Sequence, residues 1–260
     1  MRLTRVFVHG ALEPGSVVEL ARDTASHLAK VLRARSGDEI VLFNGDGREC
    51  LGVIESVRGT RISAAIGAAR TVDRESSFPI TLVQCVPRGD RMDFIVQKAT
   101  ELGVTRIVPV LSQRSVVRLD EAQAVSKQAH WQAVAVSACE QCGRNRLPGV
   151  EAPRPLLNYL GSLNAGATSS QVLRLILEPD CSQQPRSGKH TAGAEIAIGP
   201  EGGFTPEELE AFELLSFARV GLGPRVLRTE TAAIAALVVL QARYGDMSGI
   251  SDTSSRVADA

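Results

Sequence analysis

EIAIGPEGGFTPEEL at residues 195–209 and RVGLGPRVLRTETAAIAALVVLQARY at residues 219–244 decide the fold of this 260-residue chain. In the first stretch, Glu195–Ile198 predicts a short buried strand that ends in the glycine-rich turn Gly199–Gly203. Glycine permits positive φ angles and lets a ligand approach the backbone closely. In the second stretch, Gly221–Pro224 forms another glycine loop ahead of a helix. Two such loops, each between a strand and a helix, predict one binding crevice built from both.

The helices that follow the two loops carry clear start signals. Thr205 as N-cap, Pro206 at the first helical position and Glu208 at the third predict a capping box. The last helix is predicted over residues 231–244, with Thr229 or Thr231 as its N-cap. It is apolar on nearly every face, and such a helix must be covered on all sides. It is therefore either central to its domain or packed in a subunit interface.

The middle of the chain predicts an α/β domain with a parallel sheet. Ile80–Val86 is an apolar run typical of a buried strand, and Asp90 follows as the cap of a helix that Gly103 ends. Arg106–Leu111 is the next strand, which completes a strand–helix–strand unit. A long helix follows over residues 120–142. Its single tryptophan, Trp131, is interpreted as a core residue, and Val172–Leu177 is a further strand.

The chain before this domain reads as a small unit of short strands. Its apolar runs are separated by the hairpin signals Asn44–Gly47 and Arg58–Gly59, which predict a small β-barrel over residues 1–70. Residues 71–79 are polar and read as a linker to a domain over residues 80–246. Residues 247–260 have little apolar content, so we expect a disordered tail.

Composition excludes several classes of protein. The formal net charge is zero and 44% of the residues are hydrophobic, so any RNA-binding surface must be a local patch on a well-packed protein. No apolar run reaches the roughly 20 residues that span a bilayer, and the N-terminus lacks a signal peptide, so a cytoplasmic location is expected. Cys139 and Cys142 form a lone CxxC without further ligands, so no metal site is predicted.

Both glycine motifs occur together with other recognisable segments. Besides the two glycine motifs IGPEGGFTPEE and LGPRVLRTETAA, the chain contains four further segments: HLAKVLRARSGDEIVLFNGDG at 27–47, PRGDRMDFIVQKATELGV at 87–104, SQRSVVR at 112–118 and CEQCGRNRLP at 139–148. Together they resemble the ribosomal RNA small-subunit methyltransferase E family, within the SPOUT superfamily of S-adenosylmethionine enzymes. The resemblance covers most of residues 1–246. It implies a C-terminal SPOUT domain with a deep trefoil knot, a PUA-like RNA-binding β-barrel at the N-terminus, and a homodimer.

The resemblance also implies the activity and the cofactor pocket. The family transfers a methyl group from S-adenosylmethionine to N3 of a uridine in 16S ribosomal RNA, which places the assembled 30S subunit among the expected partners. Neither GxGxxG nor GxxxxGK[ST] occurs, which disfavours a dinucleotide or P-loop site. The residues expected to bind the cofactor are Leu177, Glu178, Gly199, Pro200, Glu201, Gly202, Leu222, Gly223, Val226, Leu227 and Arg228.

Uridine N3 carries a proton that must leave before or during methylation, so a base or a charge-stabilising cation is needed. Arg228, Glu230 and Glu201 are the catalytic candidates, although Glu230 fits equally well as a structural carboxylate in the first turn of the last helix. No histidine falls in the core motifs, which disfavours a histidine base.

The residues that the resemblance suggests for RNA contact are His27, Arg33, Arg88, Arg114, Gln141 and Arg144. A solvated basic face or surface ion pairs explain the cations equally well, and helix capping explains Gln141. Two other functions stay open: a SPOUT methyltransferase that acts on another RNA, and a non-catalytic RNA-binding factor in ribosome assembly.

Overall fold

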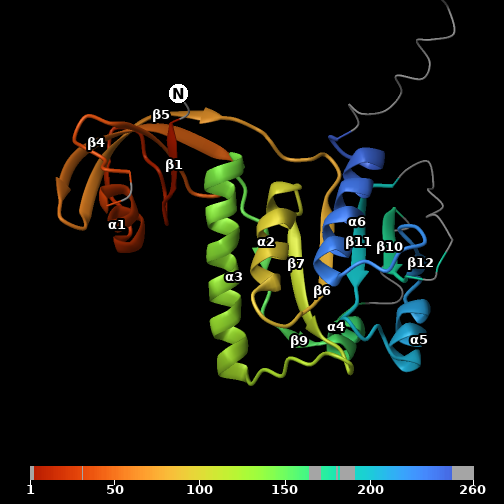
Figure 1. Cartoon of the computed structure of the whole chain (residues 1–260). Coiled ribbons are helices and arrows are strands. Elements are labelled where there is room, and N and C mark those ends of the chain that lie inside the picture. The colour runs from red at the N-terminus through yellow and green to blue at the C-terminus, as the bar shows by residue number, and fades with distance from the viewer. Residues whose placement is uncertain (1–2, 31, 164–170, 180, 182–190, 248–260) are drawn as a thin grey trace, which may run out of the picture. The chain divides into compact units, whose positions relative to one another are not determined.

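The computed structural model describes residues 3–30, 32–163, 171–179, 181 and 191–247 (Figure 1). The chain divides into two compact units. The first comprises residues 1–75 and 136–147, and the second comprises residues 76–135 and 148–260. The end of a long helix and the CGRNRL segment thus belong to the first unit, although the sequence analysis assigned them to the larger domain. The predicted tail lies almost wholly outside the described residues.

The first unit is built on one five-stranded sheet in the order β1-β3-β4-β5-β2. Its strands are β1 (Thr4–Phe7), β2 (Val17–Glu19), β3 (Glu39–Phe43), β4 (Arg48–Arg58) and β5 (Arg61–Thr71), with the helix α1 (Arg22–Lys30). β1 pairs with β3 in parallel, and the other neighbours are antiparallel. β1 and β2 stand at opposite ends of the strand order, and in the described chain no ladder joins them. The sheet therefore lacks the hydrogen-bonded closure that the β-barrel prediction required.

The hairpins of this sheet lie where the turn signals predicted them. Gly45 and Gly47, between β3 and β4, have φ angles of +91° and +96°. Gly59, between β4 and β5, has a φ of +63°. These values lie in the left-handed region that only glycine adopts without strain. The turns therefore depend on glycine at these three positions.

The predicted linker is more ordered than its composition suggested. β5 extends to Thr71, and the following residues are held by side chains from the CGRNRL segment. Asn145 Nδ2 donates to the Val72 carbonyl at 3.0 Å, and Arg74 Nη1 donates to the Gly143 carbonyl at 2.8 Å. Residues 71–75 are thus part of the first unit. The sequence pattern could not show this because the partners lie about 70 residues away.

The second unit contains a seven-stranded sheet in which every pair is parallel, as predicted. The order is β12-β10-β11-β6-β7-β8, and β9 also pairs with β7. The strands are β6 (Ile80–Cys85), β7 (Arg106–Leu111), β8 (Gly149–Val150), β9 (Arg154–Pro155), β10 (Val172–Leu177), β11 (Gly193–Ile198) and β12 (Ala218–Val220). The glycine-loop strand β11 lies between β10 and β6, and all of its residues are buried.

Helices cover both faces of this sheet (Figure 1). The helices are α2 (Arg91–Glu101), α3 (Glu121–Cys142), α4 (Leu156–Ser162), α5 (Pro206–Leu214) and α6 (Thr229–Tyr244). Leu82 and Ile196 pack with α2, α6 and Trp131 of α3, whereas their neighbours Val83 and Ala197 pack with α4 and α5. Successive strand residues point to opposite faces, so the central strands β6, β7 and β11 are covered on both faces and read as continuous apolar runs.

The ends of the helices confirm most, but not all, of the predicted caps. The capping box of Thr205 and Glu208 forms with Pro206 in the first turn, and Gly103 follows α2 with a φ of +80°. Asp90 occupies the N-cap position of α2 without a side-chain cap hydrogen bond. The N-cap prediction for α6 was wrong, because α6 begins two residues earlier than expected and its N-cap is Arg228.

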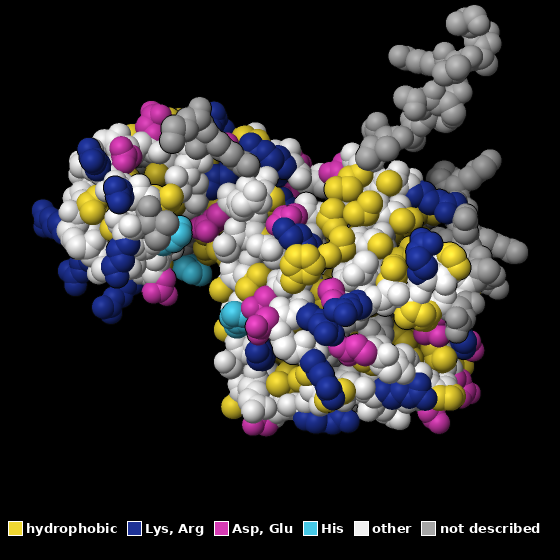
Figure 2. Space-filling view, in the orientation of Figure 1, with side chains coloured by type: hydrophobic (Ala, Val, Ile, Leu, Met, Phe, Trp, Pro, Cys, Tyr) yellow, Lys and Arg dark blue, Asp and Glu magenta, His cyan; other side chains and the backbone are white. Residues whose placement is uncertain are grey.

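One face of α6 is exposed in the single chain. Val238 is 40% exposed and Val239 is 46% exposed, and Figure 2 shows apolar side chains gathered over this helix. Covering α6 on every side, as its sequence requires, therefore needs something beyond these residues of one chain. Within the described residues, no helix combines the length and the hydropathy that spanning a membrane would demand.

Candidate active site

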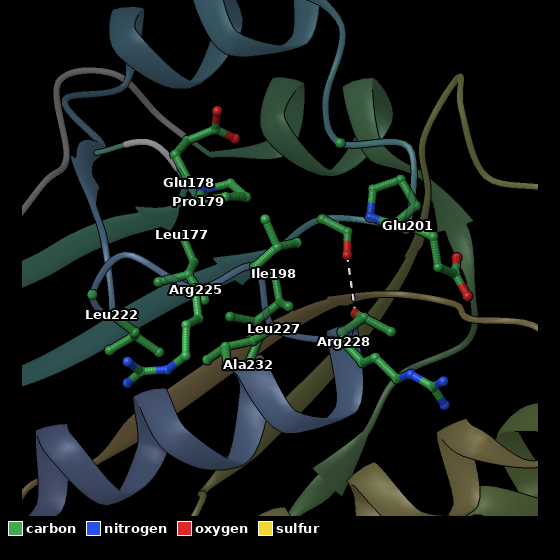
Figure 3. A pocket seen from close by; sticks show the side chains of 16 residues that line it. Leu177, Glu178, Pro179, Ile198, Glu201, Leu222, Arg225, Leu227, Arg228 and Ala232 are labelled. Carbon is green, nitrogen blue, oxygen red and sulfur yellow. Dashed lines mark hydrogen bonds between the residues drawn. The ribbon is translucent and has the colours of Figure 1, made fainter. Parts of the chain in front are cut away.

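A cavity of about 280 Å³ opens where β10 and β11 end, at the carboxyl edge of the parallel sheet (Figure 3). Its apolar wall is formed by Leu177, Ile198, Leu222, Leu227 and Ala232. Its rim is formed by both glycine loops and by the first turn of α6. Ligands of open α/β sheets bind at this edge, so the cavity stands where the topology expects a ligand.

The cavity brings together the residues that the sequence nominated. Every predicted cofactor-binding residue except Gly202 lines it. Residues that the sequence analysis did not nominate also contribute: Pro179, Ile198, Gly203, Arg225, Thr229 and Ala232. Most of these residues are direct sequence neighbours of a predicted cofactor-binding residue, so the cavity takes in more of each motif than was predicted.

A hydrogen-bond chain joins the first glycine loop to the start of α6. Gln84 Nε2 donates to Thr229 Oγ1 at 3.0 Å, and this hydroxyl donates to the Gly199 carbonyl at 3.0 Å (Figure 3). Gln84 is fully buried on β6, and Thr229 is 5% exposed. Gln84 thereby orients the Thr229 hydroxyl, which fixes the distance between the first glycine loop and the start of α6.

Replacing Thr229 with valine is expected to raise the dissociation constant for S-adenosylmethionine about tenfold. Valine has the same shape but leaves the Gly199 carbonyl without the Thr229 donor and Gln84 Nε2 with only the Cys85 carbonyl as acceptor. A buried group left unpaired costs about 1–3 kcal/mol, and about 1.4 kcal/mol corresponds to a tenfold change in the constant. Titration calorimetry measures the change. Thr231→Val is the matched control, because Thr231 is an exposed threonine in the same turn of α6. Equal constants for both variants would contradict the prediction.

A charged cluster stands at the rim. Arg91 Nη1 donates to Glu201 Oε1 at 2.8 Å, and Arg91 Nε lies 3.9 Å from Glu230 Oε1. The second oxygen of Glu230, Oε2, is buried and has no hydrogen-bond partner within the described part of the chain. Arg91 thus gathers two of the predicted catalytic residues. The role of Arg91 could not be predicted from the sequence, because its contacts join residues more than 100 positions apart.

Arg228, the third predicted catalytic residue, lines the same cavity and is exposed. Its guanidinium makes no side-chain hydrogen bond or ion pair with another described residue. In Figure 3, Arg228 and Glu201 extend toward the same side of the cavity. Arg228 can stabilise a developing anion, and the unpaired oxygen of Glu230, two residues further along the chain, can accept a proton.

The first glycine loop is also anchored from the segment after β7. Arg114 Nη1 donates to the Gly202 carbonyl at 3.0 Å and to the Phe204 carbonyl at 3.2 Å. Glu208, which is 1% exposed, accepts from Gln113 N at 2.8 Å in addition to its capping-box bond. These bonds hold the loop in place, and they give Arg114 a structural role beside the predicted RNA contact.

The other residues predicted to contact RNA fall into both units. Arg88 is exposed just after β6 in the second unit, and His27, Arg33 and Gln141 are exposed in the first. Arg144 is a correction: it is 4% exposed, its Nη2 pairs with Glu75 at 2.5 Å, and Arg5 Nη2 donates to its carbonyl. A buried, ion-paired guanidinium stabilises the CGRNRL segment and is not presented to RNA.

Comparison with known proteins identifies the chain. The model of an RNA methyltransferase domain matches residues 74–241, and that of an RNA methyltransferase PUA domain matches residues 20–66. Ribosomal RNA small subunit methyltransferase E of Bacillus subtilis is 30% identical over 87% of this chain and 90% of its own length. This chain belongs to the ribosomal RNA small subunit methyltransferase E family.

Two solved structures agree with this assignment. A methyltransferase of Legionella pneumophila in complex with S-adenosylmethionine is 38% identical, with a TM-score of 0.85 over 95% of this chain and all of its own. The methyltransferase E of Neisseria gonorrhoeae, bound to the same compound, is 36% identical, with a TM-score of 0.84 over 94% of this chain and 99% of its own. The likeness thus spans both units.

Proposed function

We propose that this protein transfers a methyl group from S-adenosylmethionine to N3 of a uridine in 16S ribosomal RNA. The observation that carries the proposal is the convergence of both glycine loops on one cavity that Arg228 lines. Glu230, two residues further on in the first turn of α6, has a buried carboxylate oxygen without a hydrogen-bond partner among the described residues. Membership of the methyltransferase E family supports the RNA and the target. The assembled 30S subunit as the substrate particle, and the cytoplasm as the location, belong to the same proposal.

The cavity fits S-adenosylmethionine chemically. Its apolar wall consists of leucine, isoleucine and alanine side chains, and the two glycine loops bring backbone groups to its rim. A ligand with an adenine ring and no phosphate needs such walls and backbone donors and acceptors. Leu177, Leu222 and Leu227 would hold the cofactor, which supplies an electrophilic methyl group on a sulfonium.

The residues at the rim account for the proton on uridine N3. Glu230 Oε2 is a buried acceptor without a partner in the described chain, so it gains a hydrogen bond when a donor arrives. We assign it to accept the N3 proton. The Arg91 guanidinium lies 3.9 Å from the other oxygen of Glu230, so the two side chains form an ion pair.

Arg228 completes this arrangement. Removal of the N3 proton places negative charge on the neighbouring uracil oxygens, and a positioned guanidinium stabilises such charge. Since Arg228 is not engaged by any described carboxylate, its charge is available to the substrate. Glu201 is bound to Arg91 and acts in this scheme as a positioning residue.

We also propose the homodimer, supported by the exposed apolar face of α6. Changing Val238 and Val239 together to glutamate is expected to convert the dimer to monomers, because unpaired charges in an apolar interface are strongly unfavourable. Sedimentation velocity measures the change. Leu214→Glu is the control, since Leu214 is 77% exposed on α5. A dimer that survives the double change would refute this interface.

The trefoil knot belongs to the proposal as well. One support for the knot is the family resemblance. The other is a close approach between Cys181, after β10, and Gly221 in the second glycine loop, because a Cβ on Gly221 would overlap the Cys181 carbonyl. Mechanical extension of a single molecule tests it. A knotted chain stays shorter at full extension than its contour length, whereas an unknotted chain reaches that length.

Methylation of purified 30S subunits with labelled S-adenosylmethionine tests the function. We expect label in 16S RNA, at N3 of a single uridine by mass spectrometry. Transfer RNA and 50S subunits serve as parallel acceptors, and label there would establish a different RNA substrate. If no RNA is labelled, calorimetry with S-adenosylmethionine separates a non-catalytic factor, which gives no heat, from an enzyme offered the wrong substrate.

A further inference from the structure

The first unit contains its own cavity, of about 600 Å³, which the proposed methyl transfer does not use. It is lined by β1, by α1 and by the last turns of α3, all within residues 1–75 and 136–147. Its lining includes Leu3, Asp23, His27, Leu32, Glu140 and Gln141. Only His27 and Gln141 were nominated from the sequence.

The cavity has apolar surface that solvent reaches. Leu3 is 36% exposed and Leu32 is 47% exposed, whereas Leu28 beneath them is 2% exposed. Large aliphatic side chains left open at a cavity gain free energy when a flat apolar group covers them. A planar ring is the simplest group of that kind.

Two of the polar side chains that line the cavity, Asp23 and Glu140, are carboxylates, which only accept hydrogen bonds when ionised. Glu140 Oε1 accepts from Phe7 N at 3.0 Å, which fixes the carboxylate, and its Oε2 has no hydrogen-bond partner among the described residues. Burial raises the pKa of Glu140, against the opposing effects of the Phe7 N–H and of nearby His27 and Arg5. The side chains of Asp23 and Gln141 likewise make no hydrogen bond to another described residue.

Charge excludes some ligands. The Nη groups of Arg5 are engaged by Glu49 and Asn145, so the charged or titratable side chains left for a ligand are the carboxylates of Asp23 and Glu140, with His27 near Glu140. Two carboxylates repel a phosphate. In the described part of the chain, no three histidine, cysteine, aspartate or glutamate side chains group to hold a metal ion. The cavity therefore fits a planar ring with N–H donors.

We propose that this cavity binds an unstacked guanine base of the RNA substrate, with Glu140 accepting from the base. Guanine presents two adjacent donors, N1–H and the N2 amino group, which match the two oxygens of a carboxylate. Adenine and cytosine present one amino group beside an acceptor, and uracil presents one donor between two acceptors, so each places a lone pair against Glu140. Single-stranded RNA is commonly read through such splayed bases. The inference rests on the proposed function in one respect, because that function makes RNA the molecule that carries the guanine.

Fluorescence anisotropy with labelled undecaribonucleotides tests the inference on the full-length protein. The probes are uridine tracts with one central guanosine, inosine, adenosine, cytidine or uridine. We expect the guanosine probe to bind about tenfold more tightly than the inosine probe, which lacks the N2 amino group, or the adenosine probe. Glu140→Gln is expected to abolish this preference, because an amide presents a donor in place of one acceptor.

Glu55→Gln is the matched control, an exposed carboxylate of the same unit outside the cavity, and it should keep the preference. If Glu140→Gln fails to fold, Leu32→Asp at an exposed position replaces it, because Leu32 is one of the side chains that the ring covers; unchanged affinity of that variant for the guanosine probe overturns the inference. Equal binding of all probes by the unaltered protein, or a preference that survives Glu140→Gln, also overturns it. The assay needs no methyl transfer, so a protein that prefers guanosine without methylating RNA would refute the proposed function alone.

Discussion

Replacing Glu230 with glutamine is expected to lower kcat for RNA methylation by about 10²–10⁴-fold, the range that a positioned general base contributes. The amide keeps the shape of the side chain but cannot accept the N3 proton at Oε2. The affinity for S-adenosylmethionine should stay nearly unchanged, because Glu230 does not line the cofactor cavity. Single-turnover methylation of 30S subunits, together with calorimetry, measures the two quantities separately.

Glu207→Gln is the control for this variant. Glu207 occupies the first turn of α5 as Glu230 occupies that of α6, but it is exposed and lies outside the cavity. A first-turn carboxylate contributes about 0.3–1 kcal/mol through the helix dipole. If Glu230→Gln lost only stability of this size and kept its kcat, the carboxylate would be structural and the proton acceptor would have to be sought elsewhere.

Replacing Glu49 with glutamine is expected to destabilise the first unit by about 3–5 kcal/mol, the usual cost of breaking a buried ion pair. Glu49 is 4% exposed and accepts from Arg5 Nη1 at 2.6 Å. It also lies 3.4 Å from both Arg70 and Arg74. Loss of its charge leaves the buried Arg5 guanidinium without its carboxylate. Hydrogen exchange of β4 amides measures the effect within this unit, and Glu55→Gln, an exposed neighbour in β4, should change little.

The same carboxylate gives a pH dependence with a definite sign. Burial alone raises the pKa of Glu49, but hydrogen bonds from Arg5 and Asn145 outweigh it, so the pKa lies below its ordinary value. A lowered folded-state pKa means that stability is present above the unfolded-state value of about 4.3 and is lost as pH falls through the folded-state value. The protection factors of β4 amides, which correct for the intrinsic pH dependence of exchange, should therefore fall with acidification below about pH 4 in the unaltered protein and fall less steeply in Glu49→Gln. Equal slopes would contradict this role.

Local patterns were sufficient to predict much of the second unit. Ile80–Val86 and Arg106–Leu111 could be assigned to parallel strands because strands buried on both faces are continuous apolar runs. The capping box at Thr205 depends on residues three positions apart, and it formed as predicted. By contrast, β12 is three residues long and α4 seven, which is too short for a periodic pattern to identify them.

The sequence by itself determined the two glycine loops, the strand–helix alternation and the family, since each depends on neighbouring residues or on motifs of fixed spacing. Only the tertiary structure decided that Arg91 gathers Glu201 and Glu230, that Gln84 supports Thr229, and that Arg144 is buried. A charged or polar side chain looks the same in a sequence whether water or a distant partner surrounds it. Its role is set by which strands become neighbours, and that order follows from packing of the whole chain.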